Sequence, residues 1–113
     1  MIIASDLWVS ALLRRIEQAG GHGYVTKKGD LRAGSVILKI INQRTRGVIL
    51  LREALSGNPD AAETVWIRPI RSIDEAELDL YIERQKARDP DLWVIEIEDV
   101  EGRHFLTEKV DLG

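Results

Sequence analysis

Apolar residues recur at spacings of three and four between residues 7 and 19, which predicts an amphipathic helix over about 6–19. Its apolar face consists of Trp8, Val9, Leu12, Leu13, Ile16 and Ala19. Ser5 or Asp6 is the expected N-cap, because either side chain can accept a hydrogen bond from a free backbone amide of the first turn. The glycine pair at 20–21 is typical of a helix end.

A second helix is predicted over 73–88. Ser72 and Glu75 match the capping box, in which each side chain satisfies a backbone donor of the other residue. Acidic side chains fill the first half of this helix and basic side chains the second, as the helix dipole favours. Pro90 cannot continue the helix, so it must end just before that residue.

Short runs rich in β-branched residues lie between the helices and predict strands. These runs cover 24–28, 35–41, 48–52 and 63–68, with polar loops at 42–47 and 56–60. The second and third runs are almost continuously apolar, which is typical of central strands covered on both faces.

The sequence from 89 to 106 predicts a strand, a tight turn and a second strand. Residues 99–102 fit a type I turn followed by a left-handed glycine, which places Glu98 opposite His104 and Ile97 opposite Phe105. Trp93, Ile95, Ile97 and Phe105 then share one face, and Glu96, Glu98 and His104 share the other. The tail, 108–113, is expected to be loose. Together these elements predict an α+β fold over residues 1–113, one domain, in which an antiparallel meander of about five to six strands packs with two helices.

Composition narrows the class of protein. The chain has 113 residues, of which 44% are hydrophobic and 31% charged, as in a globular domain. It has no cysteine, which excludes disulfides and thiolate chemistry. No apolar run approaches the roughly 20 residues that span a bilayer, and no secretory signal is apparent, so a cytosolic location without membrane contact is the default expectation.

The net charge of -3 divides unequally along the chain. Residues 1–71 contain eleven Lys or Arg and six Asp or Glu, a net charge of +5, whereas residues 72–113 contain five and thirteen, a net charge of -8. Such asymmetry can indicate a basic face for an acidic partner. The favoured interpretation is that the two halves neutralise each other in the folded protein.

The candidate chemistry centres on the predicted hairpin. Glu98 and His104, with Glu96 nearby, form an imidazole–carboxylate group that could act as a general base or as part of a metal site. The sequence supplies no third catalytic group, and the other histidine, His22, is distant along the chain, so neither catalytic nor metal-binding residues are assigned. A solvated cross-strand charge pair is the favoured interpretation.

Other motifs carry little chemistry. An acidic cluster, Asp89, Asp91, Glu96, Glu98 and Asp99, fits no known cation loop, and its first two members can satisfy turn amides beside Pro90. The glycine-rich stretch 20–23 follows a helix and so lacks the geometry of a phosphate cradle. Basic pairs at 14–15 and 27–28 lack the interleaved aromatic residues of a single-strand binder, so nucleic-acid binding is not favoured.

Two stretches resemble one family. Residues 7–15, Leu-Trp-Val-Ser-Ala-Leu-Leu-Arg-Arg, and 89–106, Asp-Pro-Asp-Leu-Trp-Val-Ile-Glu-Ile-Glu-Asp followed by Gly-Arg-His-Phe-Leu, are similar to the ends of a small bacterial family catalogued as a domain of unknown function, found mainly in alphaproteobacteria. Length and motif positions agree over nearly the whole chain, although 29–71 matches in pattern alone. The resemblance implies a cytosolic single-domain protein and assigns no activity, cofactor or catalytic residue.

Three hypotheses of function follow. The first is a non-catalytic binding or interaction module with a protein partner or with self-association through exposed strand edges. The second is a small metal-dependent or acid/base enzyme that uses Glu96, Glu98 and His104 with Asp91 or Asp99. The third is a nucleic-acid accessory protein, whose binding would weaken steeply with salt.

Overall fold

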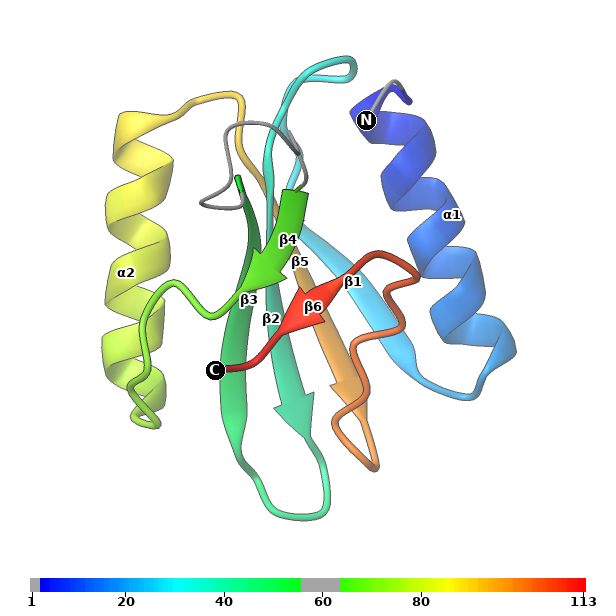
Figure 1. Ribbon diagram of the computed structural model, residues 1–113, viewed down its shortest axis with the longest axis vertical. Helices are drawn as coiled ribbons and strands as arrows, with labels where there is room; N and C mark the ends of the chain where they lie inside the picture. The colour runs from blue at the N-terminus through cyan, green and yellow to red at the C-terminus, as the bar shows by residue number, and fades with distance from the viewer. Residues whose placement is uncertain (1–2, 56–63) are drawn as a thin grey trace.

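The computed structural model describes residues 3–55 and 64–113 and consists of a six-stranded sheet with one helix on each face (Figure 1). The helices are α1 (Ser5–Gln18) and α2 (Glu75–Arg88), and the strands are β1 (His22–Lys27), β2 (Val36–Asn42), β3 (Val48–Leu55), β4 (Thr64–Ile67), β5 (Trp93–Asp99) and β6 (Val110–Asp111). The α+β class is confirmed. The loop predicted at 56–60 lies outside the described residues.

The predicted antiparallel meander is wrong, because the sheet is mixed and its strand order is β1-β5-β2-β3-β4-β6. β5 lies between β1, to which it is antiparallel, and β2, to which it is parallel. α2 carries the chain back across the sheet, which a parallel connection requires. β5 then enters the position between β1 and β2, where its apolar residues are buried on both faces.

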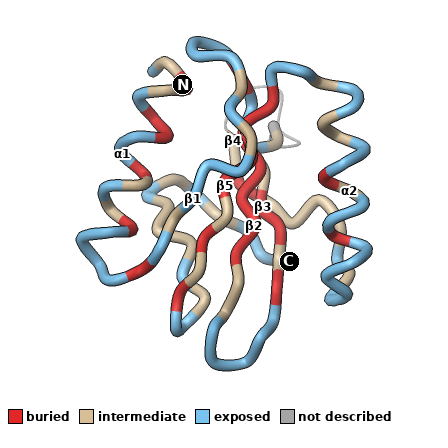
Figure 2. The backbone as a smooth tube through the Cα atoms, turned by 180° about the vertical axis from the view of Figure 1, so that it is seen from behind, coloured by how far each residue is buried: buried red, intermediate tan, exposed pale blue. Residues whose placement is uncertain are grey.

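Each face of the sheet has its own hydrophobic core. Under α1 the core contains Trp8, Val9, Leu12, Ile16, Val36, Leu38, Ile40, Leu51, Trp66, Trp93, Ile95 and Ile97. Under α2 it contains Ile37, Val48, Leu50, Leu78, Ile82, Leu92 and Val94. Figure 2 shows the buried positions concentrated in the strands between the two helices. The prediction that the two apolar runs form central, doubly covered strands is therefore confirmed.

α1 begins without a side-chain cap, so the predicted N-cap is wrong. Ala4 occupies that position, and Ser5 is already helical. The amides of Ser5 and Asp6 instead donate to the carbonyls of Arg32 and Leu31, at 3.2 and 2.9 Å, so the loop after β1 satisfies these free donors of the helix. The predicted helix end is confirmed, with Gly20 in the left-handed region at φ 88°.

α2 begins two residues later than predicted, and its N-cap is Asp74, whose side chain accepts from the amide of Ala76 at 3.0 Å. The predicted capping box is therefore wrong, and Ser72 accepts from the amide of Asp74 at 3.1 Å instead. Because the helix begins at Glu75, Ile73 lies in the loop before it, and this isoleucine is 86% exposed.

The predicted hairpin is also wrong, because both edges of β5 are already paired with β1 and β2. The chain turns at 99–102 with Gly102 at φ 71°, as the sequence predicts, but the residues after the turn form no strand until β6. Its last strand, β6, lies in the stretch predicted to be loose and pairs in parallel with β4. Within the described residues, no helix is long and apolar enough to cross a bilayer.

Candidate functional site

Glu96 and Glu98 lie on the face of the sheet that α2 covers. The register of β1 and β5 places Tyr24 opposite Glu96 and His22 opposite Glu98. Directly opposed residues of an antiparallel pair share a face. The histidine that lies across from Glu98 is therefore His22, although the two residues are far apart along the chain.

Lys39 gathers the carboxylates of this face around one buried ammonium group. Its Nζ lies 2.7 Å from Glu75 Oε2, 2.8 Å from Asp79 Oδ1 and 3.7 Å from Glu96 Oε1, while its side chain is 10% exposed. Burial disfavours the charged amine, but the hydrogen bonds to Asp79 and Glu75 outweigh burial and raise the pKa of Lys39. Glu96 therefore has a structural partner, since it helps to compensate a buried charge that ties α2 to the sheet.

Asp99 organises the turn after β5. Its Oδ2 accepts from the amides of Glu101 and Arg103 at 3.0 and 2.9 Å and from Arg103 Nε at 3.1 Å, while Oδ1 accepts from Arg103 Nη2 at 2.8 Å. The Arg103 guanidinium and the two amides hold the pKa of Asp99 at about 2. Arg103 also donates to the carbonyl of Ala19 at 3.1 Å, which draws the chain toward the end of α1.

His104 lies on the segment that crosses to the α1 face. The next residue, Phe105, packs against the core under α1, and its carbonyl accepts from Arg15 Nε at 3.1 Å. His104 Nδ1 accepts from the amide of Leu106 at 2.9 Å, and burial lowers the pKa of the imidazole. The structure therefore does not bring His104 together with Glu98, and the predicted pairing of these two residues is wrong.

Among the residues that the structure describes, no group of three or more His, Asp or Glu side chains is arranged to hold a metal ion. Asp89 accepts from the amide of Asp91 at 3.0 Å, so the turn role predicted for Asp89 is confirmed. Catalysis by Glu96, Glu98 and His104 stays a hypothesis, without a shared site to support it.

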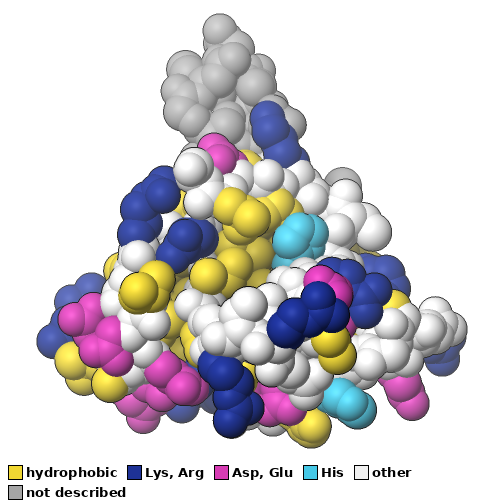
Figure 3. Space-filling model, turned by 90° about the horizontal axis from the view of Figure 1, so that it is seen from below, with side chains coloured by type: hydrophobic (Ala, Val, Ile, Leu, Met, Phe, Trp, Pro, Cys, Tyr) yellow, Lys and Arg dark blue, Asp and Glu magenta, His cyan; other side chains and the backbone are white. Residues whose placement is uncertain are grey.

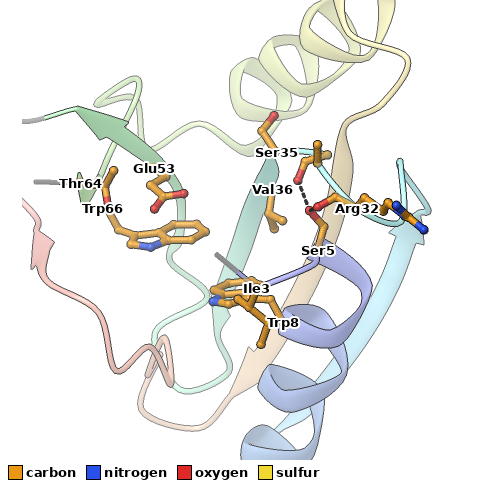
Figure 4. A pocket seen from close by; sticks show the side chains of 11 residues that line it. Ile3, Ser5, Trp8, Arg32, Ser35, Val36, Glu53, Thr64 and Trp66 are labelled. Carbon is orange, nitrogen blue, oxygen red and sulfur yellow. Dashed lines mark hydrogen bonds between the residues drawn. The ribbon is translucent and has the colours of Figure 1, made fainter. Parts of the chain in front are cut away.

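A cavity of about 390 Å³ lies between the start of α1 and the β2, β3 and β4 strands (Figure 4). Trp8 and Trp66 stack at 5.2 Å between ring centroids, and Trp8 Nε1 donates to Glu108 Oε2 at 2.6 Å. The two rings are 8% and 3% exposed, so they serve mainly as core. Ser5, one turn before Trp8 on α1, donates to the Gly34 carbonyl at 2.7 Å.

A second concave region, which we call the sheet-end hollow, lies where β2 and β3 meet their connecting turn. It measures about 320 Å³ and is lined by Ile40, Asn42, Thr45, Gly47, Val48, Ile49, Arg68, Ile73 and Gly102. Viewed from below, this end of the molecule shows a patch of apolar side chains with Lys and Arg, His, and some Asp and Glu side chains around it (Figure 3). Arg68 is the charged residue in that lining, and its Nε atom is buried without a hydrogen-bond partner.

Sequence reasoning missed this hollow. Ile73 is the first residue of the predicted helix over 73–88 and Arg68 the last of the predicted strand over 63–68, so neither prediction suggests a surface site. The available signal was the Pro69 to Ser72 stretch, since a proline followed by a helix cap predicts a loop that can leave its apolar residues exposed.

Comparison with known proteins identifies relatives over the full length. A family model described as "Protein of unknown function (DUF1491)" matches residues 3–107. A crystal structure of a DUF1491 family protein from Caulobacter crescentus CB15 is 47% identical, with 96% of this chain and 99% of that chain covered and a TM-score of 0.90. An NMR structure of a DUF1491 family protein from the same organism is also 47% identical, with 98% of each chain covered and a TM-score of 0.88.

A solution structure of a protein from A. tumefaciens is 30% identical, with both chains covered completely and a TM-score of 0.78. None of the curated proteins matches the chain. The resemblance carried by residues 7–15 and 89–106 is thereby confirmed.

Proposed function

We propose, from the premise that this chain belongs to the DUF1491 family of proteins of unknown function, that it is a non-catalytic interaction module whose contact site is the sheet-end hollow. The observation that carries the proposal is the exposure of Ile73 beside a concave apolar surface. A partner protein that places a side chain in the hollow would bury both Ile73 and this concave surface.

The hollow has the features of a docking site. Its floor is Ile40, which is 2% exposed, and its rim includes Ile73, which is 86% exposed. Full burial of an isoleucine side chain is worth about 1.5–3 kcal/mol, and the fold leaves this contribution unused at Ile73. The volume of the hollow, about 320 Å³, lies at the lower end of the range for ligand sites. Exposed apolar patches with a polar rim commonly mark interaction surfaces.

The positions of the candidate catalytic residues also favour binding over catalysis. Glu96 helps to compensate Lys39, and Asp99 is held by Arg103. Glu98 lies on the α2 face, whereas the segment that carries His104 is tied to α1. The enzyme hypothesis retains its own test, which is calorimetric titration with zinc, manganese and magnesium, where heat of binding would favour it.

Selection from a displayed library of random peptides tests the proposal. Peptides selected on the intact protein are expected to bind at least tenfold more weakly to Ile73→Ser, because the lost apolar contact is worth at least about 1.4 kcal/mol. Leu80→Ser is the matched control, since Leu80 is also an exposed aliphatic side chain. It lies on α2 and is 50% exposed.

Two outcomes would overturn the proposal: no peptide is recovered, or the selected peptides bind Ile73→Ser as tightly as the intact protein. Analytical ultracentrifugation of both proteins shows in parallel whether a second copy fills the hollow. Self-association that the serine variant abolishes would assign the hollow to a homomeric contact and would contradict the role of a foreign partner.

A further inference from the structure

We infer that the sheet-end hollow takes an acidic segment of a partner protein, with one large apolar side chain against Ile49 and Ile73 and a carboxylate on the guanidinium of Arg68. This inference rests on the proposed function and specifies the chemistry of the partner. Its first support is the charge of the lining, in which Arg68 is the charged residue and no Asp or Glu occurs among the described residues.

Arg68 is placed to receive an acceptor. The guanidinium has five N–H donors, and one of them, Nε, is buried without a hydrogen-bond partner. Its Nη2 makes a long contact of 3.4 Å with the carbonyl of Arg71. Within residues 3–55 and 64–113 no carboxylate forms an ion pair with Arg68, so its charge has no counterpart among these residues. A carboxylate is the acceptor whose two oxygens match the guanidinium fork.

The surroundings of Arg68 also favour an acidic occupant. The turn that carries Thr45 also holds Arg44 and Arg46. Arg46 lines a separate concave region with Glu75 and Glu98, so its charge is not counted toward the hollow. Arg44 is paired with Glu101 at 2.7 Å, and Arg103 is paired with Asp99 at 2.8 Å. The remaining positive charge at the hollow is not compensated from its lining. Complementary charge sets partner choice and the rate of encounter, so a basic segment would be rejected here.

The apolar part of the site sets the second requirement. Ile40 and Ile49 are opposed across β2 and β3, so their side chains share the face on which the hollow opens. Ile73 stands beside them from the loop before α2. A small polar side chain would leave these three apolar groups in contact with water. A leucine-sized side chain removes that surface from water and therefore contributes affinity as well as orientation.

The test uses three synthetic peptides and amide NMR spectra of the intact protein. The probe is acetyl-Glu-Leu-Leu-Glu-amide, the charge control replaces both Glu by Gln, and the apolar control replaces both Leu by Ser. The probe is expected to shift the amides of Gly47, Ile49 and Gly102. The charge control is expected to bind at least tenfold more weakly, and the apolar control to cause no shifts.

Arg68→Gln is expected to weaken the probe at least tenfold, and Arg68→Lys less, because lysine keeps the charge but loses the fork. Arg14→Gln is the matched control, since Arg14 is an exposed arginine on α1, and it is expected to bind the probe as the intact protein does. Equal binding of the Gln peptide, or an equal effect of the Arg14 and Arg68 changes, would overturn the inference. Dispersed amide spectra of each variant confirm that it is folded.

The outcomes separate this inference from the proposed function. Displayed peptides that map to the hollow but contain no acidic residue would support the interaction module and overturn the acidic partner. Failure of both experiments would overturn both. Vesicles of phosphatidylcholine with phosphatidylglycerol provide the remaining arm: sedimentation with these vesicles that Arg68→Gln abolishes, without peptide binding, would assign the hollow to a lipid and overturn the inference.

Discussion

Replacing Asp99 by Asn is expected to destabilise the protein strongly and in a pH-dependent way. The side chain of Asp99 is 1% exposed and accepts four hydrogen bonds, three of them from Arg103. Asparagine has nearly the same shape, but it carries no charge and has one acceptor oxygen in place of two. The change therefore removes the charge interaction and at least one hydrogen bond while it leaves the packing of the turn almost unaltered.

The magnitude follows from the pKa of Asp99, which is about 2 in the folded protein against an ordinary value of 3.8. A lowered pKa means that the folded state binds the proton less readily than the unfolded state. The stabilisation is therefore complete above the unfolded pKa and is lost as the pH falls through the folded one. A difference of this size is worth about 2 kcal/mol at neutral pH, about half of that near pH 3 and almost nothing below pH 2.

Urea unfolding followed by tryptophan fluorescence at pH 7, 5 and 3 measures this effect. Asp99→Asn is expected to lower the free energy of unfolding by about 2 kcal/mol at pH 7 and pH 5 and by about 1 kcal/mol at pH 3. Asp91→Asn is the matched control, because Asp91 is exposed and its side chain makes no hydrogen bond to the described residues. A loss below about 0.5 kcal/mol at pH 7, or a loss that does not change with pH, would refute the reasoning.

Three further predictions concern stability. Gly34→Ala is expected to cost more than about 3 kcal/mol in urea unfolding, because an added Cβ would lie 2.3 Å from the carbonyl oxygen of Asp91. Glu108→Gln is expected to cost about 1–2 kcal/mol and to shift the fluorescence of Trp8, whose indole donates to this carboxylate. His104 is expected to titrate below its ordinary pKa in an NMR pH series, because it is partly buried and Nδ1 accepts a backbone hydrogen bond that protonation would break. Stability from neutral His104 is therefore present above pH 6.5 and declines as the pH falls below it.

For each of these three predictions, one outcome would contradict it. Gly47→Ala is the control for the first, since its nearest contact would be the Thr45 hydroxyl at 3.2 Å, and an equal cost for the two alanine changes would contradict the steric argument. An unchanged emission spectrum in Glu108→Gln would contradict the second. A His104 pKa at or above that of an unstructured peptide would contradict the third.

The helices and most strands could be predicted because each is specified locally. Apolar residues at helical spacing predict α1 to within one residue at either end, and continuous apolar runs predict β2 and the start of β3. Helix starts were less predictable. α1 uses the carbonyls of the loop before β2 in place of a cap, and α2 selects Asp74 over Ser72. In both cases a contact or a competing cap residue decides the boundary.

Strand order could not be predicted from the same signals. The alternation of β5 is equally compatible with a hairpin, and the 99–102 turn was correctly predicted. What decides the topology is that β1 and β2 occupy both edges of β5. Both strands are far from β5 along the chain, so no local sequence pattern contains this information. Once these edges are taken, Arg103 bonds to Ala19 and Phe105 packs under α1.

For the candidate site too, local features could be predicted from the sequence and contacts between distant segments could not. Glu96 and Glu98 were correctly placed on one face of their strand, but their neighbours, Lys39 and His22, come from strands that are distant in sequence. The sheet-end hollow depends on the loop position of Ile73, which in turn depends on which residue caps α2. A site assembled from four separate segments has no single motif by which the sequence would reveal it.

The most direct test of the proposed contact is the side-chain Nε–Hε resonance of Arg68, recorded while acetyl-Glu-Leu-Leu-Glu-amide is added to the intact protein. A carboxylate on the guanidinium changes the charge and the hydrogen bonding around the buried Nε, so this resonance is expected to shift and to saturate together with the amide of Ile49. An Arg68 resonance that stays in place while Ile49 shifts would contradict the account.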